Sequence, residues 1–520
     1  MRALILAVVI LSIAAGAAWA DVSLSDSVGV IRVFGDTSSW VSTCFVVGDG
    51  SWVVTTWDSI TEKVGPDTNQ TIRYPLFISP YTGQAYQCEL KASNKELGIA
   101  VLKLAAPGLP GAALGQMSEF SKAAYGTMGQ LTSGDPIGNA WPTDIYGLTV
   151  EKVAGAPKLV TDQWSAAKVF VTDIGKFKWV FLSDVNPSAL IPNGSMVVHG
   201  QVVAGMYLSK LVITGGPEKV SFGRCAMSTE IARYMGDSGV DTATLYNPPK
   251  PTIVKAPDAD VAFQLQAKIY SQIGGRRPAM ALEPAQALVK LRPQDPQAKM
   301  ALGIALLGAE KPEDALKSFD EAMKLDPKLP TLRTNRALAL IALKKTTEAE
   351  SELKQAVAEA PQDVRPVLAL ADFYLGDEKM LDKALTYAQK ATEMAPNSAA
   401  AQLLVGKVEK SQKDYKAAIT SIGEALKMAP DWGDAWYALG ATCEEGGDKA
   451  SAEKAYRKLL EKQPNMPSSY ITLASFLADQ GQKDEALTIL GKLRDMKPSK
   501  DVLDTVQALE DKINGKKADK

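Results

Sequence analysis

The sequence predicts two folded parts in series, an all-β domain followed by an all-α helical solenoid. Short β-branched and aromatic runs, punctuated by Gly, Pro, Asp and Asn, fill the first half, and this pattern is typical of a β-sandwich or β-barrel. Prolines recur at a constant spacing through the second half, which indicates a stack of paired helices. A Pro-rich stretch, 246–260, lies between the two and favours a semi-rigid, extended connector.

The N-terminus predicts export. Arg2 precedes an apolar run, 4–18, and the small residues Ala18 and Ala20 stand at the −3 and −1 positions of a cleavage site. This is the layout of a secretory signal peptide over 1–20. A retained anchor is the alternative, because the run approaches the roughly 18 residues that can span a bilayer. We expect a periplasmic or secreted protein of a bacterial envelope, with no stable membrane span after cleavage.

The composition excludes several classes of function. The 520 residues are 46% hydrophobic and 22% charged, with a net charge of −2, which is ordinary for a globular chain. No basic stripe interleaved with aromatic residues suggests a nucleic-acid partner. One histidine and four scattered cysteines cannot supply a usual zinc site, and no glycine-rich loop suggests a phosphate site. We therefore expect no metal and no cofactor.

The β-domain is expected over 21–245. Six short runs carry the strand pattern: 28–33, 45–47, 52–55, 99–104, 179–182 and 202–207. Gly48-Asp49-Gly50 is expected to be the turn of a hairpin.

Four segments sharpen this prediction. They occur along the chain in the following order: SWVSTCFVVGDGSWVVTTWDSI, KASNKELGIAVLKL, FLSDVNPSALIPNGSMVVHGQVVAGM and VSFGRCAMSTEIARYM. They resemble the first hairpin, a later strand, the nucleophile loop with its following strands, and the last strand and helix of chymotrypsin-like (HtrA-type) serine proteases. The resemblance covers about 200 residues and implies a double β-barrel.

The resemblance also places the catalytic triad, and all three of its positions are replaced. The base position is Asp58, the orienting position is Gly98 and the nucleophile position is Pro192. A serine mechanism needs an imidazole base, an orienting carboxylate and an attacking hydroxyl. The chain's one histidine, His199, falls in a turn after the nucleophile loop. The resemblance therefore implies a barrel that has lost peptide-bond hydrolysis.

Two other nucleophiles are weak candidates. Ser195 falls where the family has a proline after its two glycines, and Cys225 falls in the expected last strand. Pro192 also removes a backbone N–H where the nucleophile would contribute to the oxyanion hole.

The four cysteines are Cys44, Cys88, Cys225 and Cys443. Export permits disulfides, and Cys44 with Cys88 is the first candidate pair. Buried free thiols are the alternative.

The repeats are expected over 261–498. Seven prolines follow apolar helical segments at spacings of 34, 34, 35, 34, 34 and 34 residues: Pro293, Pro327, Pro361, Pro396, Pro430, Pro464 and Pro498. Small residues recur where paired helices must approach closely, for example Gly406 and Gly440. Six to seven such units resemble tetratricopeptide repeats, and Trp436, Leu439 and Gly440 match the family's Trp-x-x-Leu-Gly opening. The last part, 499–520, is expected to be a capping helix with a basic tail.

The family resemblance implies a concave face lined by the first helix of each pair. It would include six residues of mixed charge: Arg365, Asp372, Lys407, Lys410, Asp434 and Tyr437. No cluster of Lys, Asn and Arg resembles a carboxylate clamp, so a C-terminal carboxylate ligand is not expected. Repeats of this kind bind proteins and peptides; a simple spacer is the alternative.

These parts predict an exported scaffold or adaptor that binds a protein or peptide through the repeat groove and the barrel cleft. An active envelope serine endopeptidase with a rearranged site at Ser195 is one alternative. An architectural homo-oligomer is another. The sequence leaves the partner and the oligomeric state open.

Overall fold

The structure is a computed structural model. It describes 24–34, 39–63, 69–71, 75–104, 108–116, 124–125, 139–153, 156–174, 177–183, 191–199, 202–213, 220–253, 255–274 and 277–514. The predicted signal peptide, 1–20, and the basic tail lie outside these residues. The chain forms two compact units. One contains the β-domain and the first helices up to Leu343, and the other contains the helices from Lys344 onwards.

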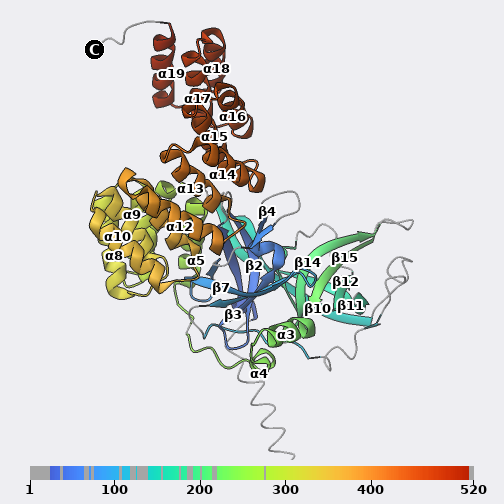
Figure 1. Cartoon of the computed structure of the whole chain (residues 1–520). Helices are drawn as coiled ribbons and strands as arrows, with labels where there is room; N and C mark the ends of the chain where they lie inside the picture. The colour runs from blue at the N-terminus through green and yellow to red at the C-terminus, as the bar shows by residue number, and fades with distance from the viewer. Residues whose placement is uncertain are drawn as a thin grey trace, which may run out of the picture. The chain divides into compact units, whose positions relative to one another are not determined.

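The first half of the β-domain is a closed six-stranded barrel (Figure 1). Its strands follow one another around the ring in the order β1 Val28–Phe34, β2 Ser39–Val47, β3 Trp52–Thr56, β8 Ile99–Leu104, β7 Ala85–Asn94 and β6 Leu76–Ile78. The predicted hairpin turn joins β2 to β3, and Gly48 and Gly50 both have a positive φ that favours glycine.

The second half is a seven-stranded sheet whose pairings are antiparallel except for the parallel pair β9–β11. Its strands are β9 Ala124–Tyr125, β10 Asn139–Val153, β11 Ala156–Ile174, β12 Phe177–Ser183, β13 Met196–His199, β14 Val202–Ile213 and β15 Val220–Met227. The sheet order is β10-β13-β14-β15-β12-β11-β9, and an additional β10–β11 pairing closes six of these strands into a second ring. Every one of the six runs predicted from the sequence is a strand.

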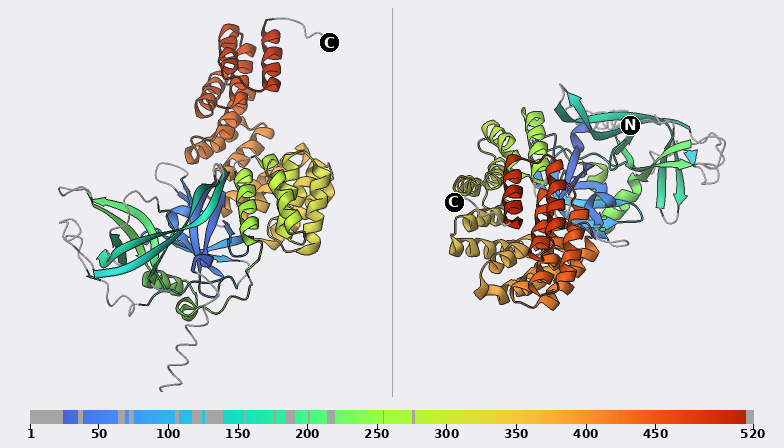
Figure 2. Two further views of the ribbon diagram at one scale, coloured as in Figure 1. Left: turned by 180° about the vertical axis from the view of Figure 1, so that it is seen from behind. Right: turned by 90° about the horizontal axis from the view of Figure 1, so that it is seen from above.

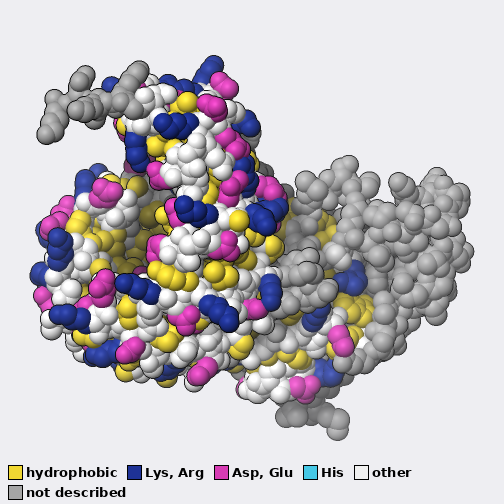
Figure 3. Space-filling model, turned by 45° about the horizontal axis from the view of Figure 1, so that its top comes forward, with side chains coloured by type: hydrophobic (Ala, Val, Ile, Leu, Met, Phe, Trp, Pro, Cys, Tyr) yellow, Lys and Arg dark blue, Asp and Glu magenta, His cyan; other side chains and the backbone are white. Residues whose placement is uncertain are grey.

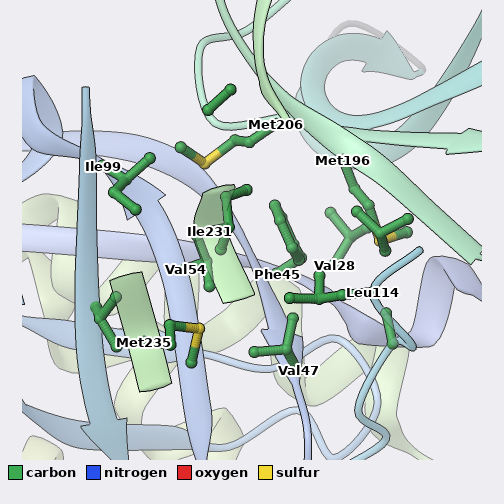
Figure 4. Close-up of a cluster of buried hydrophobic side chains, with 14 of the residues drawn as sticks. Val28, Phe45, Val47, Val54, Ile99, Leu114, Met196, Met206, Ile231 and Met235 are labelled. Carbon is green, nitrogen blue, oxygen red and sulfur yellow. The ribbon is translucent and has the colours of Figure 1, made fainter. Parts of the chain in front are cut away.

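One hydrophobic core joins the two β halves. Phe45, Val54 and Ile99 of the first barrel are fully buried, and they belong to the same cluster as Met196 and Met206 of the second ring. Figure 4 shows these side chains pointing toward one another, with Ile231 and Met235 of α3 (Ser228–Asp237) among them. Burial of this apolar surface holds the two halves together.

The Pro-rich stretch is fixed to the first barrel. After α4 (Thr242–Tyr246), the backbone N–H groups of Thr252 and Ile253 both donate to the Gly108 carbonyl oxygen, at 3.1 Å each. Lys255 Nζ then lies 2.6 Å from a carboxylate oxygen of Asp26. The connector is thus an ordered segment with contacts of its own.

The first helix of the solenoid, α5 (Ala259–Gly274), packs on the barrel. Phe263 and Tyr270 are buried in the same cluster as the barrel core. Gly83, in a barrel turn, permits the close approach, because a Cβ there would lie 2.5 Å from the Ala259 carbonyl oxygen. The barrel and the first helices therefore share one interior.

Paired helices make up the rest of the chain, and Figures 1 and 2 show them stacked in sequence order within each unit. The first unit continues with α6 Leu282–Leu291, α7 Pro296–Gly308, α8 Pro312–Leu325 and α9 Leu332–Ala342. The second contains α10 Thr346–Glu359, α11 Val364–Leu375, α12 Leu381–Met394, α13 Ala399–Ser411, α14 Tyr415–Met428, α15 Gly433–Glu445, α16 Lys449–Lys462, α17 Pro467–Asp479, α18 Lys483–Asp495 and α19 Lys500–Ile513. No helix among the described residues is long and apolar enough to cross a membrane.

The periodic prolines and small residues have the structural roles that their spacing predicts. Each periodic proline comes two or three residues after the second helix of a pair ends, where its ring prevents continuation. A Cβ added to Gly406 would lie 2.6 Å from Ile422 Cγ1, and one added to Gly440 would lie 2.4 Å from Tyr456 Cε1. The small residues therefore let the two helices of a pair approach closely.

Candidate functional site

Three positions of the β-domain that the protease resemblance assigns to a triad, Asp58, Gly98 and Pro192, lie where the two β halves meet. Asp58 lies in the short 3₁₀ segment η2 (Trp57–Ile60), and the Trp57 N–H donates to the Gly98 carbonyl oxygen at 2.9 Å. A Cβ on Gly98 would lie 3.2 Å from Leu208 Cδ1 of the second ring.

The loop that carries Pro192 lies against strand β2 of the first barrel. A Cβ on Gly194 would lie 2.1 Å from the Thr43 carbonyl oxygen, so only glycine, with its φ of +87°, fits there. Ser42 Oγ, one residue earlier on β2, donates to the Asn193 carbonyl oxygen at 3.5 Å. The residues 184–190 that precede this loop lie outside the described part of the chain.

Hydroxyl groups gather around Ser59, the residue after Asp58. Ser42 Oγ and Ser59 Oγ are 2.5 Å apart, Thr56 Oγ1 also bonds to Ser59 Oγ, and Trp40 Nε1 donates to the Ser59 carbonyl oxygen at 2.9 Å. Among the residues that the structure describes, these hydroxyls bond to one another and to the Asn193 carbonyl oxygen, and not to a group that could remove a proton. A hydroxyl without a neighbouring base is a weak nucleophile.

His199 and Ser195, the other residues that the sequence singled out for a serine mechanism, both lie in or next to strand β13. His199 ends strand β13 and pairs with Val202 across the β13–β14 hairpin, as expected for a turn residue. Ser195 is fully buried, and its Oγ donates to the Pro192 carbonyl oxygen at 2.6 Å. Its hydroxyl proton is therefore directed into the loop's own backbone.

All four cysteines are buried free thiols in this structure, so Cys44 and Cys88 are not joined. Both lie in the hydrophobic cluster inside the first barrel. Burial raises the pKa of the Cys44 thiol, and the nearby Cys88 raises it further. Burial also raises the pKa of Cys225 on β15. These groups are thiols and not thiolates at neutral pH, which makes them poor nucleophiles.

The helical part contains a pocket of about 440 Å³, which we call the repeat pocket. It is lined by residues from three consecutive first helices, α11, α13 and α15: Leu375, Lys407, Lys410, Ser411, Asp434, Tyr437, Ala438 and Ala441. Four of the six residues predicted for the concave face, Lys407, Lys410, Asp434 and Tyr437, are thus brought together.

The other two predicted residues do not line the repeat pocket. Arg365 binds its neighbour Asp363, with Nη2 2.6 Å from one carboxylate oxygen and Nε 2.9 Å from the other. Asp363 is also the N-cap of α11 and accepts the Arg365 backbone N–H at 3.0 Å. Asp372 is exposed on the same helix.

The pocket-lining residues that the sequence missed are apolar or small. Leu375 stands 35 residues before Lys410, and Ala441 stands 34 residues after Lys407. Each therefore occupies the position of a predicted groove residue in a neighbouring repeat, the next one for Leu375 and the preceding one for Ala441. This equivalence is the signal that could have found them.

The charges of the repeat pocket are mixed. Lys410 Nζ lies 2.7 Å from Glu445 Oε1, and Asp434 Oδ2 accepts the Trp432 indole N–H at 3.3 Å. Figure 3 shows the same interleaving of basic and acidic side chains over the exposed face of the helices. No group of three or more potential metal ligands occurs among the described residues.

Comparison with known proteins concerns the helical part. Two tetratricopeptide-repeat family models match, one at 306–372 and 340–408 and the other at 267–330, 406–467 and 445–501. None of the curated proteins compared with the chain matches it. A thermophilic tetratricopeptide-repeat protein of Thermus thermophilus is 24% identical, with 35% of this chain and 98% of that one covered and a TM-score of 0.33.

A tetratricopeptide-repeat protein from Parabacteroides merdae is 19% identical, with 47% of this chain and 97% of that one covered and a TM-score of 0.37. The family models agree with the constant proline spacing and with the close contacts at Gly406 and Gly440. The helical part of this chain consists of tetratricopeptide repeats.

Proposed function

We propose that this chain is an exported protein-binding scaffold whose tetratricopeptide repeats hold a segment of a partner protein. One observation carries the proposal: four predicted groove residues from two successive first helices converge on the repeat pocket. Its volume of about 440 Å³ is within the usual range for ligand pockets, about 300–1,000 Å³. A protein-interaction role is also what tetratricopeptide repeats suggest.

The barrel, in this proposal, is a chymotrypsin-like domain that binds without cutting. Two six-stranded rings and the proximity of the positions equivalent to the triad support this assignment. Asp58, Gly98 and Pro192 provide neither a base nor a nucleophile at these positions. Proteases hold substrates as added strands, and that mode of binding does not require the triad. The cleft of the barrel is therefore proposed as a second contact with the partner.

Export is the third part of the proposal. The apolar run after Arg2 and the small residues before Asp21 support a signal peptide. The scaffold would then act in the periplasm or outside the cell. Two binding modules on one exported chain would raise the effective concentration of a partner that contacts both.

Site-specific photo-crosslinking tests the proposal. Tyr437 in the full-length chain is replaced by the photoreactive amino acid p-benzoylphenylalanine in the cells that produce it, and Lys416, exposed on α14 and absent from the pocket lining, is replaced in a control. We expect irradiation to give a discrete adduct with another protein from position 437 and none from position 416. Mass spectrometry then identifies the partner.

Equal adducts from both positions, or none from either, would reject binding at the repeat pocket. An adduct of twice the chain's mass that contains only this protein would show that the pocket contacts a second copy of the chain. The proposed scaffold role would then be replaced by an architectural homo-oligomer.

A further inference from the structure

We infer that the repeat pocket selects a peptide segment in which a single acidic side chain stands beside an apolar side chain. This inference rests on the proposed function and adds the chemistry of the ligand. It is drawn from the Lys407 ammonium group, the Asp434 carboxylate and the apolar side chains that line the pocket.

Lys407 is the cation that gives the pocket its preference for an acid. The other lining lysine, Lys410, already forms an ion pair with Glu445 at 2.7 Å. Lys407 is exposed on α13, and in the part of the chain that the structure describes no carboxylate lies within ion-pair distance of its ammonium group. A carboxylate of a bound peptide would provide the missing charge-assisted hydrogen bond.

Tyr437 supplies the apolar half of the site. Its side chain is 51% exposed, while its ring lies 6.3 Å from that of Tyr456, which is almost fully buried. Leu375, Ala438 and Ala441 line the same pocket. An exposed aromatic ring above small and aliphatic residues is a typical anchor for an apolar side chain of a ligand.

Asp434 limits the number of acidic side chains that a bound peptide can carry. It lines the pocket from the first turn of α15, seven residues before Ala441, which is the repeat equivalent of Lys407. With a rise of 1.5 Å per residue, Asp434 and the Ala441 position, which is level with Lys407, are about 10 Å apart along the helix. A second ligand acid at that distance would meet a like charge, which disfavours acidic runs.

The first experiment is a selection of phage-displayed random heptapeptides on the full-length chain, with a Tyr437→Ser variant for counter-selection. We expect the enriched peptides to carry one Asp or Glu beside an aromatic or aliphatic residue. Enriched peptides without an acid would overturn this inference and leave the proposed function intact. No enrichment over the variant would reject the proposed function itself.

The second experiment assigns the acid to Lys407. A fluorescent heptapeptide from the selection and its Glu→Gln isostere are titrated against the wild-type chain and Lys407→Gln by fluorescence anisotropy. An exposed ion pair corresponds to about a fivefold change in Kd at most outside a buried site, so we expect Lys407→Gln to weaken the acidic peptide about fivefold. The isostere should bind both proteins equally.

Two further variants complete the design. Lys416→Gln removes an exposed lysine of α14 that is not in the pocket lining and should leave the Kd unchanged. Asp434→Asn should strengthen a peptide with two acids more than a peptide with one. Equal effects of Lys407→Gln on the acidic peptide and its isostere, with unchanged circular dichroism, would overturn the assignment.

Discussion

At the scale of single residues, glycine in a helix has opposite consequences at two positions of the same helix pair. Gly406 in α13 lies against α14, where a Cβ would lie 2.6 Å from Ile422 Cγ1 and 3.1 Å from the Ala418 carbonyl oxygen. Gly423 in α14 has no heavy atom within 4 Å of the place that a Cβ would occupy. The first glycine is required by packing, and the second only weakens its helix.

Alanine substitutions at these two glycines should therefore change stability in opposite directions. Gly423→Ala should raise the free energy of unfolding by about 1 kcal/mol, the usual difference in helix propensity. Gly406→Ala gains the same propensity but overpacks the contact with Ile422 at a cost of about 1–3 kcal/mol, so we expect a net loss of up to about 2 kcal/mol. Urea unfolding followed by circular dichroism measures both. A Gly406→Ala variant more stable than the wild type would show that α13 and α14 adjust to the added methyl group at a cost smaller than the gain in helix propensity.

At the scale of elements, the first helix pair is clamped by an ion pair that depends on pH. Arg292, just after α6, donates to Asp258, just before α5, through Nε at 2.8 Å and Nη2 at 2.6 Å. The guanidinium lowers the pKa of the Asp258 carboxyl from its ordinary value of 3.8. A lowered carboxyl pKa stabilises the fold above the ordinary value, and this stabilisation is lost as the pH falls through the folded pKa.

Asp258→Asn should consequently destabilise the chain at neutral pH but not in acid. We expect a loss of about 1 kcal/mol at pH 7, as for a charge-assisted pair that is partly exposed. The gap between wild type and variant should close as the pH falls below 3.8. Urea midpoints from pH 7 to pH 2.5 measure it, with Asp260→Asn as a matched change of charge. A gap that stays constant over this range would exclude an electrostatic role.

Periodicity predicted the helices because each repeat imposes the same packing on equivalent residues. The prolines and Gly406 and Gly440 follow this rule, and so do four of the six groove residues. Arg365 does not line the repeat pocket, and its guanidinium binds the adjacent Asp363. Repeat spacing does not encode a contact of this local kind. Six of the strands, β1, β2, β3, β8, β12 and β14, were predicted from β-branched runs. Strand β9 and the β10–β11 pairing that closes the second ring depend on long-range register, which a single sequence does not reveal.

At the scale of the whole molecule, the docking of the first helix on the barrel is what the sequence did not predict. A repeat stack needs its two ends covered, because each unit buries its apolar face only against its neighbours. The predicted capping helix, α19, covers the C-terminal end with a largely polar outer face. At the other end, Phe263 and Tyr270 of α5 are buried with the barrel core. The barrel therefore also acts as the N-terminal cap of the solenoid.

A large-to-small substitution at this junction should weaken the barrel and the first repeats together. Phe263 is 3% exposed, and Phe→Ala at a buried site usually costs about 3–5 kcal/mol. We expect Phe263→Ala to accelerate amide hydrogen exchange in α5 and α6 and also in barrel strands β6 and β7. Peptides from α15 to α18 serve as the internal control and should keep their wild-type rates. Acceleration confined to α5 and α6 would mean that the barrel does not depend on the helix it covers, and that the two parts share a surface but not a folding unit.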